Sequence, residues 1–528
     1  MERRPTIEIM ESAMQSAPLL LNGQPLTLAE IESVAAANRP VTVAPEAIAR
    51  VVRSRQVIES ILETGQTVYG VNTGFGKLAD VRIPPDRLAQ LQTNLVRSHA
   101  CGLGEPLSEA ESRAMLLLRA NVLAKGHSGV RPELLHLLAA MLNAQVHPII
   151  PAKGSVGASG DLAPLAHLAL AVIGEGEAIY KAHRQPAAHA LAAAGLAPLP
   201  LAAKEGLALL NGTQAMTAVG ALTIAHAERL ARIADLAGAM SLEALMGTPV
   251  AFDARIHAAR PHPGQIASAA NLTATLEGSE IRESHKSNDP RVQDAYCLRC
   301  MPQVHGAVRG VLGHVTQILE TESGSATDNP LVFPIAAEKS EQGTGAEILS
   351  GGNFHGAPLS YAFDYAAIAL TDLASISERR IDRLINPDIN EGLPAFLCSD
   401  AGLSSGYMIA HVTAAALLNE CKVLAHPSST DSVPTSGGKE DHVSMGMTGA
   451  LKLRQIAQNL EHILAIEMMC AAQGLDYRQP LQPSRAVARA QARIRAIVPH
   501  LDEDRVPAPD IEAIARLIQT GKLLENQA

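Results

Sequence analysis

The sequence predicts a mainly α-helical protein. Its 528 residues are 47% apolar, yet aromatic residues make up only 2% and Trp is absent. Ala, Leu, Val and Ile therefore carry the apolar content, and this mix favours helices over β-sandwiches. Long apolar stretches also follow residue 205, at 212–246, 304–322, 358–386, 406–426 and 444–474. They exceed the mean helix length of about 11–12 residues and are apolar on several faces, so they predict a buried helical bundle.

Shorter helices and Gly- or Pro-bearing loops are expected before residue 205, with ordered structure beginning near Leu26. Ser108 and Glu111 have the spacing of a capping box, which predicts the start of a helix, and a second helix is expected over 132–142. Segment 147–160, HPIIPAKGSVGASG, is too rich in Pro and Gly for a helix interior. The expected organisation is an N-terminal extension (1–20), an N-terminal domain (21–205) and a helical-bundle domain (206–528).

The charge balance argues against a nucleic-acid partner. The chain has 43 Lys and Arg against 53 Asp and Glu, a net charge of −10, without basic blocks. No apolar run approaches the roughly 20 residues that span a bilayer, and the N-terminal segment lacks the apolar core of a signal peptide. We therefore expect a soluble, cytoplasmic protein that does not contact a membrane.

The six Cys residues are expected to be free thiols rather than a disulfide framework. Cys297 and Cys300 form a local pair that suggests a redox or zinc site. No second pair or nearby Cys/His cluster in the sequence supplies the remaining ligands of such a site. The sequence therefore predicts no metal.

Residues 154–161, GSVGASGD, offer unusual chemistry. Because glycine lacks a Cβ, the amide nitrogen of Gly160 can approach the carbonyl carbon of Ala158 in a tight turn. Cyclisation there, with loss of the Ser159 hydroxyl as water, gives an imidazolone with an exocyclic methylene, an electrophile that no natural side chain offers. The tripeptide alone is a weak signal, because an ordinary flexible loop has the same composition.

The longer segment 154–168, GSVGASGDLAPLAHL, resembles the prosthetic-group signature of the aromatic amino acid lyase family, which includes phenylalanine lyases and histidases. Further segments resemble the family in the expected order and cover nearly the whole chain: YGVNTGFG (69–76), NLVRSHACGLG (94–104), NGTQAM (211–216), QDAYCLRCMPQV (293–304), TDNPLVF (327–333), GGNFHG (351–356), LNECKVLAHP (418–427) and EDHVSMG (440–446).

The resemblance implies a fold of the fumarase/aspartase-like superfamily, in which a long central helical bundle joins a smaller, mostly helical N-terminal domain that carries the prosthetic-group loop. It implies 4-methylideneimidazol-5-one as the prosthetic group, formed autocatalytically from Ala158, Ser159 and Gly160, with no external cofactor. It also implies a homotetramer whose active sites are shared between subunits and which acts on a small-molecule amino acid.

The resemblance assigns roles to two residues directly. Tyr69 would remove a β-proton from the substrate, and since a free phenol has a pKa near about 10, the site must lower that pKa or pair the phenol with a cation. Arg299 would clamp the substrate carboxylate, a task suited to a planar, bidentate donor. Without the motifs, a turn tyrosine and a solvated arginine would be the ordinary interpretations.

Further residues complete the expected site. Tyr296 and Gln293 precede Arg299 at intervals of three residues, so a helix would place all three on one face, and the family places Tyr296 beside the prosthetic group near the amine. Asn211 would contact the prosthetic group and the substrate, and Phe354 would line the pocket, although a plain core phenylalanine is nearly as reasonable.

Glu420 is also expected to be catalytic. It lies in the apolar segment AAALLNECKVLAH, where an ionised carboxylate is costly unless it is paired. A buried ion pair is the other interpretation of this residue. The functional one is favoured because the segment belongs to the family pattern.

His99 follows Ser98 as in histidine-active members of the family, and its donor and acceptor nitrogens suit an imidazole ring. Some tyrosine lyases and tyrosine aminomutases also carry Ser-His. The segments LAHP (424–427) and EDHVSM (440–445) resemble the histidine-active branch. Lys439 departs from that branch, which commonly carries Gln or another neutral residue there.

The expected reaction is therefore the elimination of ammonia from L-histidine to give trans-urocanate, the first step of histidine degradation. A tyrosine ammonia-lyase or tyrosine aminomutase with the same electrophile is the first alternative. A non-catalytic helical assembly protein is the second, and the intact set of polar residues argues against it.

Overall fold

The computed structural model describes residues 17–287, 289, 291–335 and 346–524. The chain forms two compact units. Unit 1 contains the described residues up to Leu222 together with Thr316–Phe363 and Ser428–Leu451, and unit 2 contains Thr223–Val315, Asp364–Pro427 and the described residues from Lys452 onward. Most of the expected N-terminal extension lies outside the described residues, and the expected boundary near residue 205 stays a prediction.

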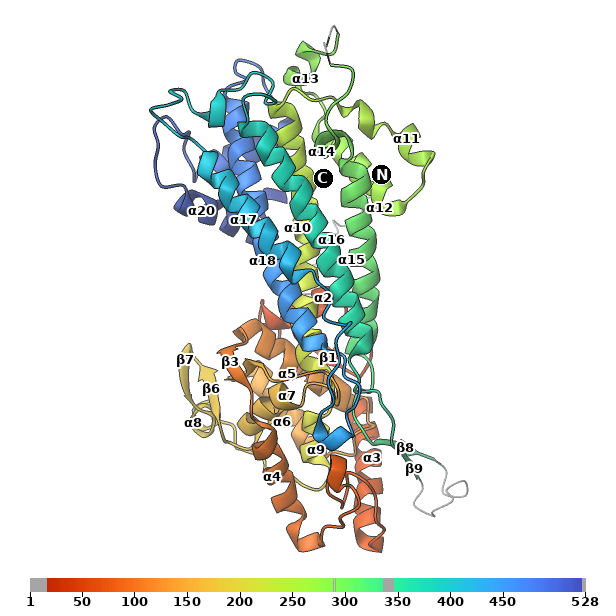
Figure 1. The fold of residues 1–528 in the computed structure, drawn as a ribbon. Coiled ribbons are helices and arrows are strands. Elements are labelled where there is room, and N and C mark those ends of the chain that lie inside the picture. Colours follow the sequence, from red (N-terminus) through yellow and green to blue (C-terminus); the bar gives the residue numbers. More distant parts are fainter. Residues whose placement is uncertain (1–16, 288, 290, 336–345, 525–528) are drawn as a thin grey trace, which may run out of the picture. The chain divides into compact units, whose positions relative to one another are not determined.

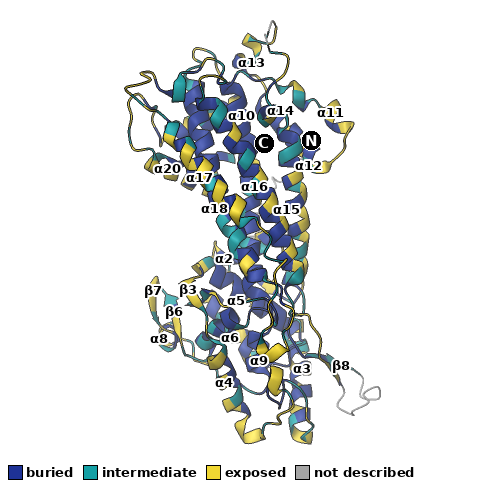
Figure 2. Cartoon of the chain, in the orientation of Figure 1, coloured by how far each residue is buried: buried dark blue, intermediate teal, exposed yellow. Residues whose placement is uncertain are grey.

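Helices dominate the secondary structure, which confirms the mainly α-helical prediction (Figure 1). Each predicted long helix is present within a few residues of its expected bounds: α10 (Gln214–Ala244), α15 (Met301–Ser323), α16 (Ala357–Ile385), α17 (Met408–Leu424) and α18 (Gly446–Asp476). Much of α10 and α18 is coloured as buried in Figure 2. The consecutive residues Ile463, Leu464, Ala465 and Ile466 of α18 are all fully buried, so this part of the helix is enclosed on every side.

Helix α5 (Glu109–Ala124) lies at the centre of unit 1, where it packs against α2 (Leu28–Ala35) and α6 (Pro132–Asn143). It begins with the predicted capping box: the Ser108 hydroxyl accepts from the Glu111 amide at 3.2 Å, and the Glu111 carboxylate accepts from the Ser108 amide at 2.8 Å. Every residue from Glu111 to Ala124 is buried. The remaining helices of unit 1 are α3 (Pro45–Thr64), α4 (Leu88–His99), α7 (Leu162–Val172), α8 (Ala187–Ala193) and α9 (Glu205–Leu210).

Helices α4, α7 and α9 pack against one another. His99 is the last residue of α4, the Ala158–Gly160 tripeptide comes shortly before α7, and Asn211 directly follows α9. Packing of these helices therefore brings together candidate residues that are far apart in the sequence.

Short strands complete unit 1. Within the described residues the first regular element is β1 (Leu19–Leu21), which pairs in parallel with β2 (Val41–Val43), so the expected start near Leu26 is wrong. Three apolar residues carry too little periodicity to reveal such a strand. Segment 147–160 is not helical, as predicted, but it contains β4 (His147–Pro148) and β5 (Pro151–Lys153). The other strands are β3 (Leu103–Pro106), β6 (Glu177–Tyr180), β7 (His183–Pro186), β8 (Leu331–Pro334) and β9 (Ala346–Leu349), paired β3–β5, β4–β6–β7 and β8–β9.

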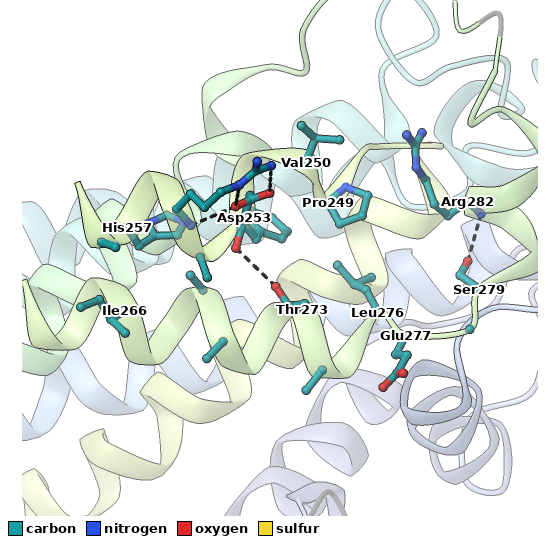
Figure 3. Close-up of a pocket in the computed structure, with 18 of the residues that line it drawn as sticks. Pro249, Val250, Asp253, His257, Ile266, Thr273, Leu276, Glu277, Ser279 and Arg282 are labelled. Atoms are coloured by element: carbon teal, nitrogen blue, oxygen red, sulfur yellow. Dashed lines mark hydrogen bonds and ion pairs between the residues drawn. The ribbon is translucent and has the colours of Figure 1, made fainter. Parts of the chain in front are cut away.

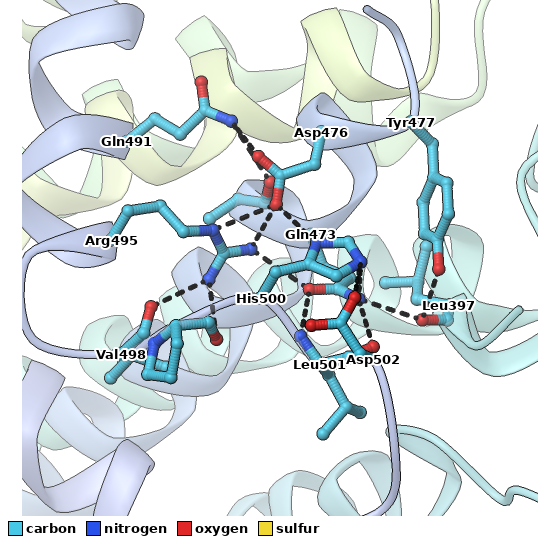
Figure 4. A network of polar contacts seen from close by, with 12 residues as sticks. Leu397, Gln473, Asp476, Tyr477, Gln491, Arg495, Val498, His500, Leu501 and Asp502 are labelled. Carbon is cyan, nitrogen blue, oxygen red and sulfur yellow. Dashed lines mark hydrogen bonds and ion pairs between the residues drawn. The ribbon is translucent and has the colours of Figure 1, made fainter.

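Unit 2 adds shorter helices to its parts of the long ones: α11 (Ala254–Ala258), α12 (Pro263–Thr275), α13 (Glu280–Ser284), α14 (Tyr296–Arg299), α19 (Arg485–Arg495) and α20 (Ala508–Gln519). Asp476, at the end of α18, joins the C-terminal segment to that helix (Figure 4). Its carboxylate accepts from Gln491 at 2.7 Å, Arg495 at 2.9 Å and His500 at 2.8 Å.

The cysteines are free thiols, as predicted. Within the described ranges, His, Cys, Asp and Glu side chains form no group of three that could hold a metal ion. No helix in the described part of the chain is long and apolar enough to cross a membrane.

A buried ion pair lies inside unit 2. Arg380 donates to both carboxylate oxygens of Glu467, at 2.6 and 2.9 Å, and both side chains are 0% exposed. Glu467 also accepts from the hydroxyls of Ser241 and Ser377, at 2.7 and 2.6 Å. The hydroxyl groups are neutral, so Arg380 supplies the positive charge that balances the buried carboxylate of Glu467.

We expect Arg380→Met to lower the free energy of unfolding by roughly 3–5 kcal/mol, because it leaves Glu467 charged, buried and unpaired. Arg379→Met is the matched control, since Arg379 is a 54% exposed side chain that pairs with Glu378 and Asp382. Its loss should cost no more than about 1 kcal/mol. Urea unfolding of both variants measures the difference, and equal costs would contradict this account of the core.

Candidate active site

The Ala158–Gly160 tripeptide forms a tight turn before α7. Gly160 has a φ of +76°, in the left-handed region that favours glycine. A Cβ at Gly160 would overlap the carbonyl group of Gly212, with which Gly160 forms a parallel β-bridge. The next amide, that of Asp161, donates to the Gly212 carbonyl oxygen at 2.7 Å. The tripeptide is therefore folded against the Asn211–Gly212 segment, and only glycine fits at its third position.

Two side chains hold Ser159. The side-chain nitrogen of Asn211, Nδ2, donates to the Ser159 carbonyl oxygen at 2.8 Å. The Ser159 hydroxyl donates to Oε1 of Glu440 at 2.6 Å, and Oε2 of Glu440 accepts from the Thr435 hydroxyl at 2.8 Å. Sequence reasoning missed Glu440 as a site residue. The signal was present, because Glu440 begins the motif EDHVSMG, which served to indicate the family and the substrate but not a site residue.

Asp161 is fully buried directly after the tripeptide. Its carboxylate accepts from the Ser155 hydroxyl at 2.8 Å and from the Met216 amide at 2.9 Å. Burial raises the pKa of Asp161 to about 6, although these hydrogen bonds oppose the shift. The carboxylate thus ties both ends of the turn, residues 155 and 161, to the first turn of α10.

Adjoining cavities of about 310, 480 and 360 Å³ share Ser159, Ser436 and Glu440 in their walls. Besides Ser159, four predicted site residues line the first of them: Tyr69, His99, Asn211 and Phe354. Ala158 lines the second and third, and Gly160 lines the third. Lys439 lines the second cavity together with Tyr69, so this departure from the family pattern lies at the site.

Tyr69 is half-buried, and the described chain makes it a weaker acid. Burial raises the pKa of Tyr69 above its ordinary value, and the nearby charge of Glu440 adds to the rise, while a backbone hydrogen bond at Gly76 opposes it. The expectation that the site lowers this pKa is therefore not met within one chain. Lys439 lines the second cavity together with Tyr69, and a cation close to the phenol would oppose this rise.

His99 presents a defined nitrogen to the cavity. Its Nδ1 lies 2.9 Å from the Leu95 carbonyl oxygen, which can only accept, so Nδ1 carries the hydrogen. Burial lowers the pKa of His99, which favours the neutral ring. In that ring Nε2 is an acceptor, available to an N–H donor such as a substrate imidazole.

Residues 26–496 match the sequence profile of the aromatic amino acid lyase family. The chain belongs to this family.

Individual relatives resemble this lyase over nearly its whole length. A histidine ammonia-lyase of Koribacter versatilis (strain Ellin345) is 56% identical over 508 residues, which cover 96% of this chain and 98% of that one. The crystal structure of histidine ammonia-lyase from Trypanosoma cruzi superposes with a TM-score of 0.88 at 43% identity, covering 97% of this chain and 95% of that one. Tyrosine aminomutase from Streptomyces globisporus gives a TM-score of 0.90 at 41% identity, covering 96% and 98%. The fold is that of the fumarase-like lyases.

Three predicted residues of this lyase lie in unit 2 and do not line the cavities at Ser159. Arg299 donates to the side-chain oxygen of Gln293, and its guanidinium lies 5.7 Å from the centre of the Tyr296 ring, which is 75% exposed. The expected helical stripe is wrong in one respect, because α14 begins at Tyr296 and Gln293 precedes it. The three side chains nevertheless form one cluster, in which Gln293 and Tyr296 are exposed and Arg299 is half-buried.

Glu420 does not line the cavities either. It is exposed on α17 and accepts a hydrogen bond from Asn459 at 2.8 Å. Glu420 is therefore not a buried carboxylate within one chain, where its apolar neighbours Val412 and Val423 are also 56% and 68% exposed, and its expected catalytic role stays a prediction. The carboxylate that contacts Ser159 is Glu440.

A larger cavity of about 1280 Å³ lies within unit 2, lined by residues of α11, α12 and α13 (Figure 3). The apolar residues Phe252, Ile266 and Leu276 line it, and Arg255, which also lines it, is paired with Asp253 at 2.7 Å. None of the predicted site residues lines it. The polar groups suited to catalysis are instead gathered around Ser159.

Proposed function

We propose that this lyase eliminates ammonia from L-histidine and releases trans-urocanate, the first step of histidine degradation. The main observation behind the proposal is that two hydrogen bonds fix Ser159 in the cavity wall. Its hydroxyl donates to Glu440 at 2.6 Å, and its carbonyl oxygen accepts from the Asn211 side chain at 2.8 Å. The histidine ammonia-lyase of Koribacter versatilis supports histidine as the substrate, because it is 56% identical over 508 residues. Release of ammonia from L-histidine by the purified protein tests the proposal, and its absence at every pH would overturn it.

We propose that Ala158, Ser159 and Gly160 form 4-methylideneimidazol-5-one without an external cofactor. The left-handed turn at Gly160 and the absence of space for a Cβ there support this, since ring closure needs the Gly160 amide turned back on the tripeptide. Once formed, the group supplies an electrophilic methylene carbon to the substrate amine or imidazole ring. The remaining residues of the site bind the substrate and move its protons.

Tyr69 is proposed to accept the β-proton, because it lines the same cavity as Ser159. His99 and Glu440 are proposed to hold the substrate ring: Nε2 of neutral His99 accepts from one imidazole nitrogen, and the Glu440 carboxylate accepts from the other when the ring is protonated. Phe354 and Asn211 complete the wall of the cavity. In this proposal Glu440 takes the role that the sequence had assigned to Glu420.

We propose a homotetramer in which a second chain completes each site with Gln293, Tyr296 and Arg299. Supporting this, Gln293 and Tyr296 are exposed, and the half-buried Arg299 already lies against Tyr296 with its guanidinium 5.7 Å from the ring centre. Arg299 would then bind the substrate carboxylate. Its positive charge would also oppose the rise in the pKa of Tyr69. A cytoplasmic location stays a prediction from the sequence.

A tyrosine ammonia-lyase or aminomutase is the second candidate, and the structural similarity to tyrosine aminomutase at 41% identity favours it. A phenol ring offers one hydroxyl group where an imidazole offers two nitrogens. The pair formed by His99 and Glu440 has a partner for each imidazole nitrogen, so the geometry favours histidine.

The proposed role of Tyr69 predicts a specific pH dependence. Tyr69 can accept a proton only as the ionised phenolate. Because the pKa of the Tyr69 phenol is raised in the described chain, the phenolate fraction grows throughout the range from about pH 6 to about pH 9. We therefore expect kcat/KM for L-histidine to increase over this range. Tyr69→Phe should lower kcat by about 10²- to 10⁴-fold and abolish this increase. Tyr477→Phe, which removes a hydroxyl bonded to the Leu397 carbonyl, is the control and should keep the wild-type profile. An active Tyr69→Phe variant with an unchanged pH profile would contradict the assignment.

A further inference from the structure

Arg119 lies in the middle of α5 and is fully buried. Its Nη1 donates to the Ala208 carbonyl oxygen at 2.6 Å, and its Nη2 donates to the Asn211 carbonyl oxygen at 2.9 Å. Nη2 also donates to the side-chain oxygen of Gln214, whose amide nitrogen donates to the Thr327 hydroxyl at 2.9 Å. One guanidinium therefore fixes the end of α9, the residue after it and the start of α10.

These contacts provide hydrogen-bond donors for the carbonyl groups at the end of α9. The last carbonyl groups of a helix have no partner within the helix, and burying them unpaired is costly. Ala208 belongs to that last turn, and the positive guanidinium also suits the negative end of the helix dipole. Arg119 thus determines where the chain goes as it leaves α9, which is where Asn211 and Gly212 lie.

Asn211 and Gly212 are the surface against which the tripeptide is folded. The side chain of Asn211 donates to the Ser159 carbonyl at 2.8 Å, and the Gly212 carbonyl accepts from the Asp161 amide at 2.7 Å. A Cβ at Gly212 would overlap Arg119 itself, so this glycine lies directly against the guanidinium. The position of the turn at Ser159 is therefore set through Asn211 and Gly212 by Arg119.

We propose that Arg119 is a positioning residue for the autocatalytic cyclisation of Ala158, Ser159 and Gly160. Arg119 touches none of the reacting atoms and acts through Asn211 and Gly212. The inference rests on the proposed function, since it requires that the prosthetic group forms in this chain.

The chemistry balances without an added reagent. The Gly160 nitrogen bonds to the Ala158 carbonyl carbon, and that carbonyl oxygen leaves as water with the hydrogens of the Gly160 and Ser159 amides. The Ser159 hydroxyl then leaves as a second water with the hydrogen of its own Cα, which creates the methylene. No atom needs an external oxidant or reductant. Reaction within one chain depends strongly on geometry, and a displacement of about 1 Å can slow it about a hundredfold.

The experiment measures the mass of the peptide that contains residues 158–160, at intervals after cell-free synthesis of the full chain. Arg119→Lys keeps the positive charge but loses the forked donors, and Arg119→Met loses both. Arg113→Lys and Arg113→Met are matched controls, because Arg113 is a buried arginine of the same helix whose hydrogen-bond partners among the described residues are the Val34 and Leu142 carbonyls, at 2.8–3.0 Å. Only chains that elute as the folded assembly are analysed.

We expect the wild type and both Arg113 variants to lose two waters at the same rate, Arg119→Lys at least about tenfold more slowly, and Arg119→Met more slowly still. Wild-type rates in folded Arg119 variants would overturn the inference. Equal slowing in the Arg113 variants would also overturn it, since a general loss of stability would then explain the result. A wild-type peptide that keeps both waters would overturn the proposed function instead. If Arg119→Met does not fold, Arg119→Lys alone decides between these outcomes.

Discussion

Ser159→Ala is expected to reduce kcat for L-histidine by on the order of 10⁴-fold or more, because it removes the group from which the electrophile is made. Alanine is smaller than serine and cannot clash in the turn, so the fold should be kept. Only the hydrogen bond to Glu440, at 2.6 Å, is lost. The ultraviolet difference spectrum against the wild type should show the missing prosthetic group, and the peptide containing residue 159 should not lose the second water.

Ser54→Ala provides the control for this substitution. Ser54 is also buried, and within the described part of the chain its hydroxyl donates to the Val51 carbonyl, at 3.0 Å. That variant should keep the absorbance and the activity of the wild type. A Ser159→Ala protein that still eliminates ammonia at more than about 1% of the wild-type rate would show that another group activates the substrate.

The second large effect distinguishes two glutamates. Glu440→Gln should lower kcat by about 10²- to 10⁴-fold, since an amide cannot take up a proton or balance a protonated imidazole. Glu420→Gln is the comparison variant, because Glu420 is exposed in one chain and accepts a hydrogen bond from Asn459 there. A change within about twofold would leave the carboxylate role to Glu440, and a comparable loss would show that Glu420 completes a site in the assembly. Steady-state kinetics with L-histidine measure both. If Glu420→Gln caused the larger loss, the assignment made from the sequence would be restored and the one made from the structure would fail.

Much of the fold could be predicted because long helices carry strong periodic signals. The bounds of α10, α15, α16, α17 and α18 lie within a few residues of those expected, and the capping box at Ser108 marked the start of α5. The strands could not be predicted in the same way. β1 has three residues and β4 has two, which is too short for an alternation of apolar and polar residues to stand out.

The candidate site was predicted where residues stand in recognisable motifs. Tyr69, His99, Asn211 and Phe354 line one cavity with Ser159, although they come from distant segments of the chain. Glu420 was assigned because its segment belongs to the family pattern, and that assignment stays a prediction; only its expected burial is not met, because an apolar helix need not be buried within its own chain. The face of α17 that carries Val412 and Val423 is exposed, and a second copy of the chain is one surface that could cover it.

Other contributions could be found only in three dimensions. Arg119 stands in an apolar stretch, LLLRANVLA, where the sequence gives no indication that its guanidinium reaches the carbonyls of Ala208 and Asn211. The raised pKa of Tyr69 likewise depends on burial and on Glu440, which is distant in sequence. The first finding concerns the position of the backbone at the site, and the second concerns the acidity of one of its side chains. Neither can be read from the list of residues that the site contains.

The most direct test of the central proposal is to incubate the purified protein separately with L-histidine and L-tyrosine and to identify the products by their ultraviolet spectra and by mass. The account predicts trans-urocanate and ammonia from L-histidine, with little or no product from L-tyrosine. Coumarate or β-tyrosine from L-tyrosine, with no urocanate from L-histidine, would contradict it.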